Sequence, residues 1–141
     1  MTKTEVCPGN LTPGFDTYSP ACSRRLFNGK KVSHILDFNY DADKENFITA
    51  INQISISGVQ EKLSVIIDKG KIILTPNGKQ GRYIIKPTPG YKYLRFRDQI
   101  PANEHLTMQI ARQVYKINTA DNAMIFFADG EAAYILSLIH I

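Results

Sequence analysis

The chain has 141 residues, of which 43% are hydrophobic and 21% are charged. These proportions are typical of one globular domain, not of a disordered or membrane protein. The sequence contains no apolar run near the roughly 18 residues that cross a bilayer, and its start lacks the apolar core of a secretory signal. The formal charge of +4 permits an anionic ligand, but the dispersed basic residues favour a solvated face over a nucleic-acid patch. We therefore expect a cytoplasmic protein.

Residues 1–40 are rich in turns and contain both cysteines, Cys7 and Cys22. The segments CPGN, TPG and SP predict a small N-terminal knob, with one short helix over 21–27 that ends at Asn28. A structural disulfide is not expected in a reducing compartment. Two cysteines also fall short of the four nitrogen or sulfur ligands of a stable zinc site, so we predict no metal.

Strand patterns follow a short amphipathic helix that we expect over residues 41–53. The β-rich runs 63–67 and 71–74 are joined by a Lys-Gly turn, and a third run, 82–86, ends at Pro87. Such short connections predict an antiparallel meander.

The segment 101–115 has the pattern of an amphipathic helix. Pro101 suits the first turn, where Glu104 also interacts favourably with the helix dipole. Leu106, Ile110 and Val114 fall on one face, which is widened by Met108, Ala111 and Tyr115. We expect this face to pack against the sheet and the helix to end near Asn118.

Two further strands are predicted over 123–127 and 132–135, joined by a hairpin turn at Asp129-Gly130. Strands, one main helix and more strands describe an α+β fold: a twisted antiparallel sheet with a helix packed on one face. This is the layout of a kinase small lobe. It would occupy 41–135, after the Cys-containing segment 1–40.

The last six residues, 136–141, read LSLIHI. This string is the translation of a transposon-end adaptor that is used to fragment DNA for sequencing. We therefore expect a truncated fragment whose gene continues, and no role for His140. The alternative is a genuine strand, which the apolar content of the segment would allow.

The segment 54–62, ISISGVQEK, leads directly into the first predicted strand. Small residues and a glycine let the backbone approach phosphates and point its N–H groups at them. Ser55 and Ser57 could each accept a phosphoryl group, which adds about two negative charges. The alternative is an ordinary Ser/Gly turn.

Lys86 ends an apolar strand, and Glu104 lies in the first turn of the following helix. In kinases a strand lysine neutralises the ATP phosphates and is held by a helix carboxylate. Alternatively, Lys86 reaches solvent and Glu104 only complements the helix dipole. His105 is expected to pack or cap rather than to catalyse.

The strings ISISGVQEKLSVI, GRYIIKP and PANEHLTMQIARQ together resemble the HipA family of toxin kinases, over about 54–135. The resemblance implies a serine/threonine kinase of a type II toxin–antitoxin system that uses ATP and Mg²⁺ to phosphorylate an aminoacyl-tRNA synthetase. It implies autophosphorylation at Ser55 and Ser57, and a lysine-positioning role for Glu104. It assigns ATP contacts to Ser57, Gly58, Val59, Gln60, Glu61, Lys62 and Lys86.

The same resemblance places the catalytic aspartate, the Mg²⁺ ligands and the adenine-binding hinge beyond residue 141, so this fragment should be inactive. It implies a HipB-like antitoxin as partner, contact with DNA only through that antitoxin, a separate small protein that supplies an N-terminal subdomain, and no membrane. Related proteins carry a possible zinc clasp at the amino end, where Asn10 and Ser19 here replace two ligands. The alternative function is a non-catalytic basic module that binds an antitoxin or another anionic partner.

Overall fold

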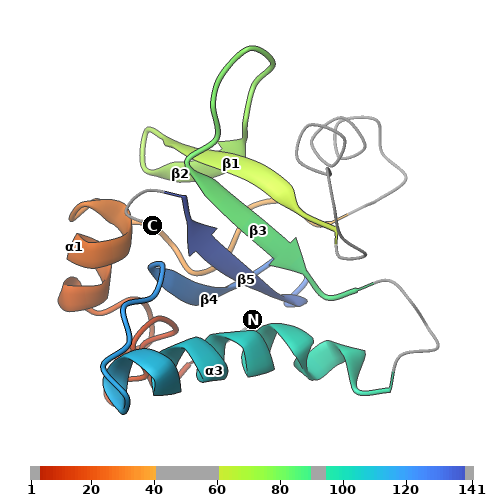
Figure 1. The fold of residues 1–141 in the computed structure, drawn as a ribbon. Helices are drawn as coiled ribbons and strands as arrows, with labels where there is room; N and C mark the ends of the chain where they lie inside the picture. The colour runs from red at the N-terminus through yellow and green to blue at the C-terminus, as the bar shows by residue number, and fades with distance from the viewer. Residues whose placement is uncertain (1–3, 41–60, 90–94, 139–141) are drawn as a thin grey trace.

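The computed structural model describes residues 4–40, 61–89 and 95–138, and these form an α+β fold, as predicted (Figure 1). A five-stranded antiparallel sheet has the order β2-β1-β3-β5-β4. Two α-helices flank it, and a short 3₁₀ turn, η1 (Arg97–Gln99), precedes the second. The bounds are α1 Pro20–Phe27, β1 Leu63–Asp68, β2 Lys71–Leu74, β3 Tyr83–Pro87, α3 Ile100–Gln113, β4 Asn122–Phe126 and β5 Ala132–Ser137.

The predicted meander corresponds to β2-β1-β3. Lys69 and Gly70 connect the β1–β2 hairpin, both with positive φ, the backbone that matches the twist of a two-residue hairpin. The chain then leaves the sheet through α3 and returns as β4 at the edge, so that β5 fills the place beside β3. Helix α3 packs against β4 and β5 (Figure 1).

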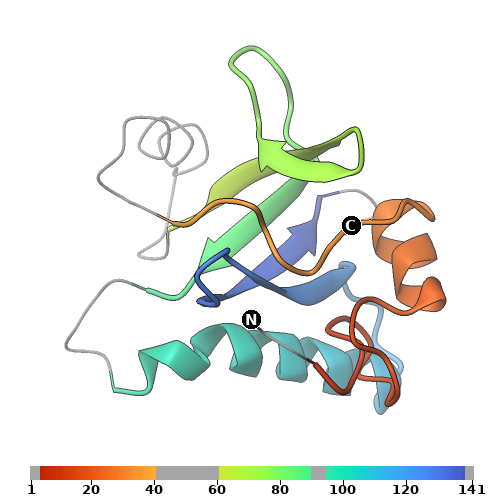
Figure 2. The same cartoon turned by 180° about the vertical axis from the view of Figure 1, so that it is seen from behind.

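The later part of the N-terminal segment packs against the sheet face opposite α3, whereas the turn at Gly9 and Asn10 lies beside α3 itself (Figure 2). Leu26 and Phe27 of α1 belong to the same buried cluster as Ile85 of β3 and Ile125 of β4. The Tyr83 hydroxyl donates a 2.7 Å hydrogen bond to the Leu26 carbonyl, which ties α1 to β3. The first forty residues and the sheet therefore share one hydrophobic core.

Helix α1 confirms the short helix predicted in this segment. The Ser19 side chain caps its start by accepting a hydrogen bond from the Cys22 N–H, and Asn28 ends it with a left-handed backbone. Helix α3 is shorter than predicted and ends at Gln113. Lys116 adopts a positive φ there, which turns the chain away from the helix axis.

The packing face predicted for α3 is wrong. Leu106, Ile110 and Val114 are 48%, 42% and 66% exposed, whereas His105 and Gln109 are buried against the sheet and the N-terminal segment. Periodicity locates an apolar stripe but does not show which side of a helix packs against the rest of the protein. In α3 the polar side packs there, because its side chains make hydrogen bonds to the sheet and the N-terminal segment.

The C-terminal residues Leu136 and Ser137 belong to β5, where they pair with Ile84 and Tyr83 of β3. This is the behaviour expected of genuine strand residues, and the adaptor origin of 136–141 stays a prediction. The helix expected over 41–53 lies outside the described residues. In the part of the chain that the structure describes, no helix is long and apolar enough to cross a membrane.

We predict that Leu106→Ala changes the free energy of unfolding by about 0.5 kcal/mol or less, because the side chain is half exposed. The fully buried Ile85→Ala should lower it by about 2–5 kcal/mol. Urea denaturation of the two variants measures both changes. A loss for Leu106→Ala as large as that for Ile85→Ala would mean that the apolar stripe of α3 faces the core after all.

Candidate functional site

The centre of the candidate site is the ion pair between Lys86 of β3 and Glu104 of α3. Side chains alternate along β3, so that Tyr83, Ile85 and Pro87 are buried in the core while Lys86 lies on the α3 side. Lys86 Nζ donates a hydrogen bond to Glu104 Oε2 at 3.3 Å. The structure thus brings together the two residues that the sequence analysis paired.

The ion pair lies at the border between the interior and solvent. The side chains of Lys86 and Glu104 are 23% and 31% exposed. Lys86 Nζ also lies 5.9 Å from the ring centroid of Tyr134, its partner across the strands, within the range of a cation–π contact. Burial, and then the nearby Glu104 charge, raise the pKa of Tyr134, so its ring stays a neutral phenol beside the ammonium.

A cleft of about 460 Å³ opens beside this ion pair. Its size falls within the usual range for small-molecule sites. Its walls are largely apolar. Two of its lining residues, Lys86 and Glu104, are charged. The lining residues are Lys86, Ile100, Asn103, Glu104, Thr107, Met108, Tyr134 and Leu136.

The predicted phosphate loop is described only at its end. Ser55, Ser57, Gly58, Val59 and Gln60 lie outside the described residues. The Glu61 carboxylate accepts a hydrogen bond from the Tyr40 hydroxyl. Lys86 pairs instead with Glu104.

The register of the sheet places the start of β1 beside the Lys86 end of β3. Leu63, the first residue of β1, pairs with Ile85, so the chain enters the sheet beside the end of β3 that carries Lys86. Glu61 and Lys62, the last two residues of the predicted loop, therefore lie at the entry to β1, near the strand end that carries Lys86.

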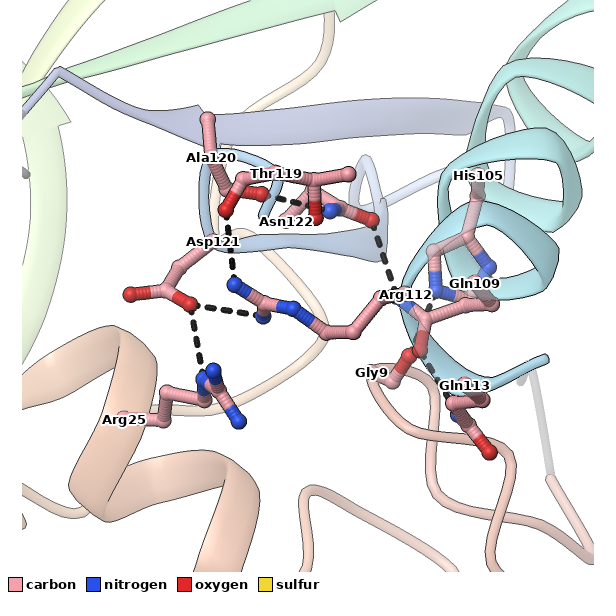
Figure 3. Close-up of polar contacts among 10 residues, drawn as sticks. All are labelled: Gly9, Arg25, His105, Gln109, Arg112, Gln113, Thr119, Ala120, Asp121 and Asn122. Carbon is pink, nitrogen blue, oxygen red and sulfur yellow. Dashed lines mark hydrogen bonds and ion pairs between the residues drawn. The ribbon is translucent and has the colours of Figure 1, made fainter. Parts of the chain in front are cut away.

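Buried polar contacts fix α3, and with it Glu104, against the rest of the molecule (Figure 3). His105 is 2% exposed, and its Nε2 lies 2.6 Å from the Gly9 carbonyl oxygen. One turn later, Gln109 Nε2 donates to Asn122 Oδ1 at 3.1 Å. Burial lowers the pKa of His105, which favours a neutral ring that donates through Nε2.

The C-terminal end of α3 is held by an ion-pair network (Figure 3). Arg112 donates to Asp121 Oδ1 and to the Thr119 carbonyl, each at 2.7 Å. Arg25 of α1 reaches the same Asp121 oxygen at 3.0 Å. Sequence reasoning missed these residues; the one signal was the helical spacing of His105, Gln109 and Arg112.

A strand lysine held by a helix carboxylate beside a cleft is the arrangement of a kinase small lobe. A family model described as the HipA-like C-terminal domain matches residues 54–137, which is more than half of the chain. The chain therefore belongs to the HipA family, a family of kinases. No curated protein matches the chain.

We predict that lowering the pH from 7.5 to 5.5 destabilises the protein in part through His105. Its pKa is lowered in the folded state, so the unfolded chain takes up the proton first. Stability is therefore full above the ordinary histidine pKa of about 6.5 and is lost as the pH falls below it, by at most about 1.4 kcal/mol per pH unit.

Denaturant unfolding of the wild type and of His105→Gln at both pH values measures this effect. Glutamine keeps a donor for the Gly9 carbonyl but does not titrate, so the variant should lose less stability on acidification. Equal losses in the two proteins would exclude His105 as the cause, because every other titratable group is unchanged.

Proposed function

We propose that this chain is the ATP-binding part of a HipA-like serine/threonine protein kinase. The observation that carries the proposal is the Lys86–Glu104 ion pair at the mouth of a cleft. In kinases the corresponding lysine contacts the phosphates of ATP. Membership of the HipA family supports the same function.

In this proposal Lys86 supplies the positive charge for the nucleotide. Glu104 accepts one hydrogen bond from the Lys86 ammonium. The other two N–H groups of the ammonium are left to donate to phosphate oxygens. Because α3 is fixed at His105, Gln109 and Arg112, the Glu104 carboxylate is held in place before the nucleotide arrives. Such preorganisation lowers the cost of binding.

The loop 57–62 would close over the phosphates through its backbone N–H groups, as its glycine and small residues allow. Mg²⁺ would neutralise phosphate charge during transfer. In residues 4–40, 61–89 and 95–138 no group of three acidic, histidine or cysteine side chains is placed to hold a metal ion.

For the intact protein we propose phosphoryl transfer to a hydroxyl of a protein substrate, as in a toxin that modifies a translation component such as an aminoacyl-tRNA synthetase. A HipB-like antitoxin would be its partner. The catalytic base and the metal ligands would come from sequence beyond residue 141, so the 141-residue chain should bind nucleotide without transferring phosphate.

We predict that Lys86→Ala weakens ATP binding by about tenfold to hundredfold, the value of one charge-assisted hydrogen bond. Glu104→Gln should weaken it less, because the lysine remains but is no longer held by an anion. Lys71→Ala is the matched control, since Lys71 pairs with Asp37 at the exposed sheet edge.

Isothermal titration calorimetry of the 141-residue chain measures these affinities. The proposal fails if the wild type binds no ATP, or if Lys71→Ala and Lys86→Ala weaken binding equally. The second outcome would instead indicate a dispersed basic surface, as in the alternative of an anion-binding module.

We also predict that Ser55 and Ser57 carry the autophosphorylation of the intact protein. Phosphate on either serine would add negative charge beside the nucleotide phosphates and oppose their binding. Radiolabelled ATP with the double variant Ser55→Ala/Ser57→Ala should show loss of label, whereas Ser64→Ala, in β1, should keep it. Undiminished labelling of the double variant would refute this role.

A further inference from the structure

Cys7 and Cys22 both lie beside the peptide of Gly9. Both are free thiols and are 0% and 7% exposed. The Gly9 N–H donates to Cys7 Sγ at 3.4 Å. A Cβ added to Gly9 would lie 2.0 Å from Cys22 Sγ. The sequence places the two cysteines fifteen positions apart, and the fold brings them to one residue.

The polar surroundings of the two sulfurs differ. Cys7 Sγ also accepts a hydrogen bond from the Ser19 N–H at 3.2 Å, so two backbone donors point at it. A hydrogen bond from the Cys22 thiol, together with these donors, holds the pKa of Cys7 well below its usual range although burial opposes the shift. The same contact and burial raise the pKa of Cys22. Cys7 is therefore the more acidic of the two thiols.

The backbone around the two thiols is already fixed. Ser19 Oγ accepts from the Cys22 N–H at 3.2 Å, and Asn10 Nδ2 donates to Ser19 Oγ at 3.0 Å. These bonds join the turn after Cys7 to the first turn of α1. They hold the two cysteines next to each other in the folded chain.

A second cleft, of about 640 Å³, gives access to this place. It lies between the turn that contains Gly9, helix α1 and the C-terminal half of α3, and Cys22 is part of its wall. A small oxidant can approach Cys22 through it, and Cys7 lies directly behind, fully buried.

We propose that Cys7 and Cys22 form a reversible intramolecular disulfide when the protein meets hydrogen peroxide. The Cys7 thiolate attacks one peroxide oxygen, the O–O bond breaks, and the departing hydroxide takes a proton from solvent to become water. The Cys22 thiol then attacks the Cys7 sulfenic acid; the S–O bond breaks and a second water leaves with the Cys22 proton. Two thiols are oxidised to one disulfide, and one peroxide is reduced to two waters.

The bond would act on the anchor of α3. The Gly9 carbonyl accepts the hydrogen bond from His105, which follows Glu104 in α3. Because both sulfurs lie beside Gly9, closing the disulfide shifts this peptide relative to the His105 ring. In this way, oxidation of the N-terminal segment would affect the position of α3. Disulfides with this kind of regulatory role are the form expected in a reducing compartment.

Mass spectrometry of the peroxide-treated chain tests the proposal. Trypsin leaves both cysteines in the peptide 4–24, which should lose the mass of two hydrogen atoms and resist alkylation until dithiothreitol is added. Cleavage before Asp16 places the two cysteines on separate peptides. These two peptides should then be held together only by the disulfide bond. In Cys22→Ser, Cys7 should instead be trapped by dimedone as the sulfenic acid.

The proposal is overturned if both cysteines still alkylate after peroxide, if they reach sulfonic acid without a cross-link, or if the disulfide joins two chains and doubles the mass. The mapping of the wild-type chain decides among these outcomes even if Cys22→Ser does not fold. The readout is independent of nucleotide binding, so the test stands apart from the proposed kinase function.

Discussion

In β3, alternate side chains leave the strand on opposite faces of the sheet, and the position of Lys86 follows from this pleat. Tyr83 and Ile85 enter the core that the N-terminal segment completes. Their burial fixes the register of the strand, because a slip of one residue would expose them and bury the lysine. Lys86 is therefore held on the α3 side by apolar contacts made on the other side. The ion pair with Glu104 depends on a core that it does not touch.

Helix α3 is attached to this sheet by directional contacts. His105, Gln109 and Arg112 each reach a partner outside the helix, and together they fix its rotation about its own axis. An apolar interface tolerates rotation and sliding better than a set of hydrogen bonds with defined geometry. The rotation that these bonds impose points Glu104 at Lys86 and leaves Leu106 and Ile110 half exposed.

The N-terminal segment contributes both to the core and to the attachment of α3. Helix α1 of this segment buries Leu26 and Phe27 against the sheet. The turn before the helix supplies the Gly9 carbonyl that His105 contacts. Arg25 of this segment and Arg112 of α3 both pair with the carboxylate of Asp121. A change in this segment, such as a bond between Cys7 and Cys22, can therefore reach the helix that carries Glu104.

The sequence by itself determined the elements and the two charged residues of the site. Runs of β-branched residues, a Lys-Gly turn and a proline at a helix start are local signals, and the strands and helices they predict lie within a few residues of those observed. Lys86 and Glu104 could be predicted because a lysine at a strand end and a carboxylate in the next helix are also local features of the sequence.

Tertiary structure alone decided which face of α3 is buried, that Cys7 and Cys22 lie together, and that β5 lies between β3 and β4. Each of these depends on partners distant in the sequence, such as Gly9 for His105. The free energy of such contacts depends on where the partners lie in space, which periodicity along the chain does not record.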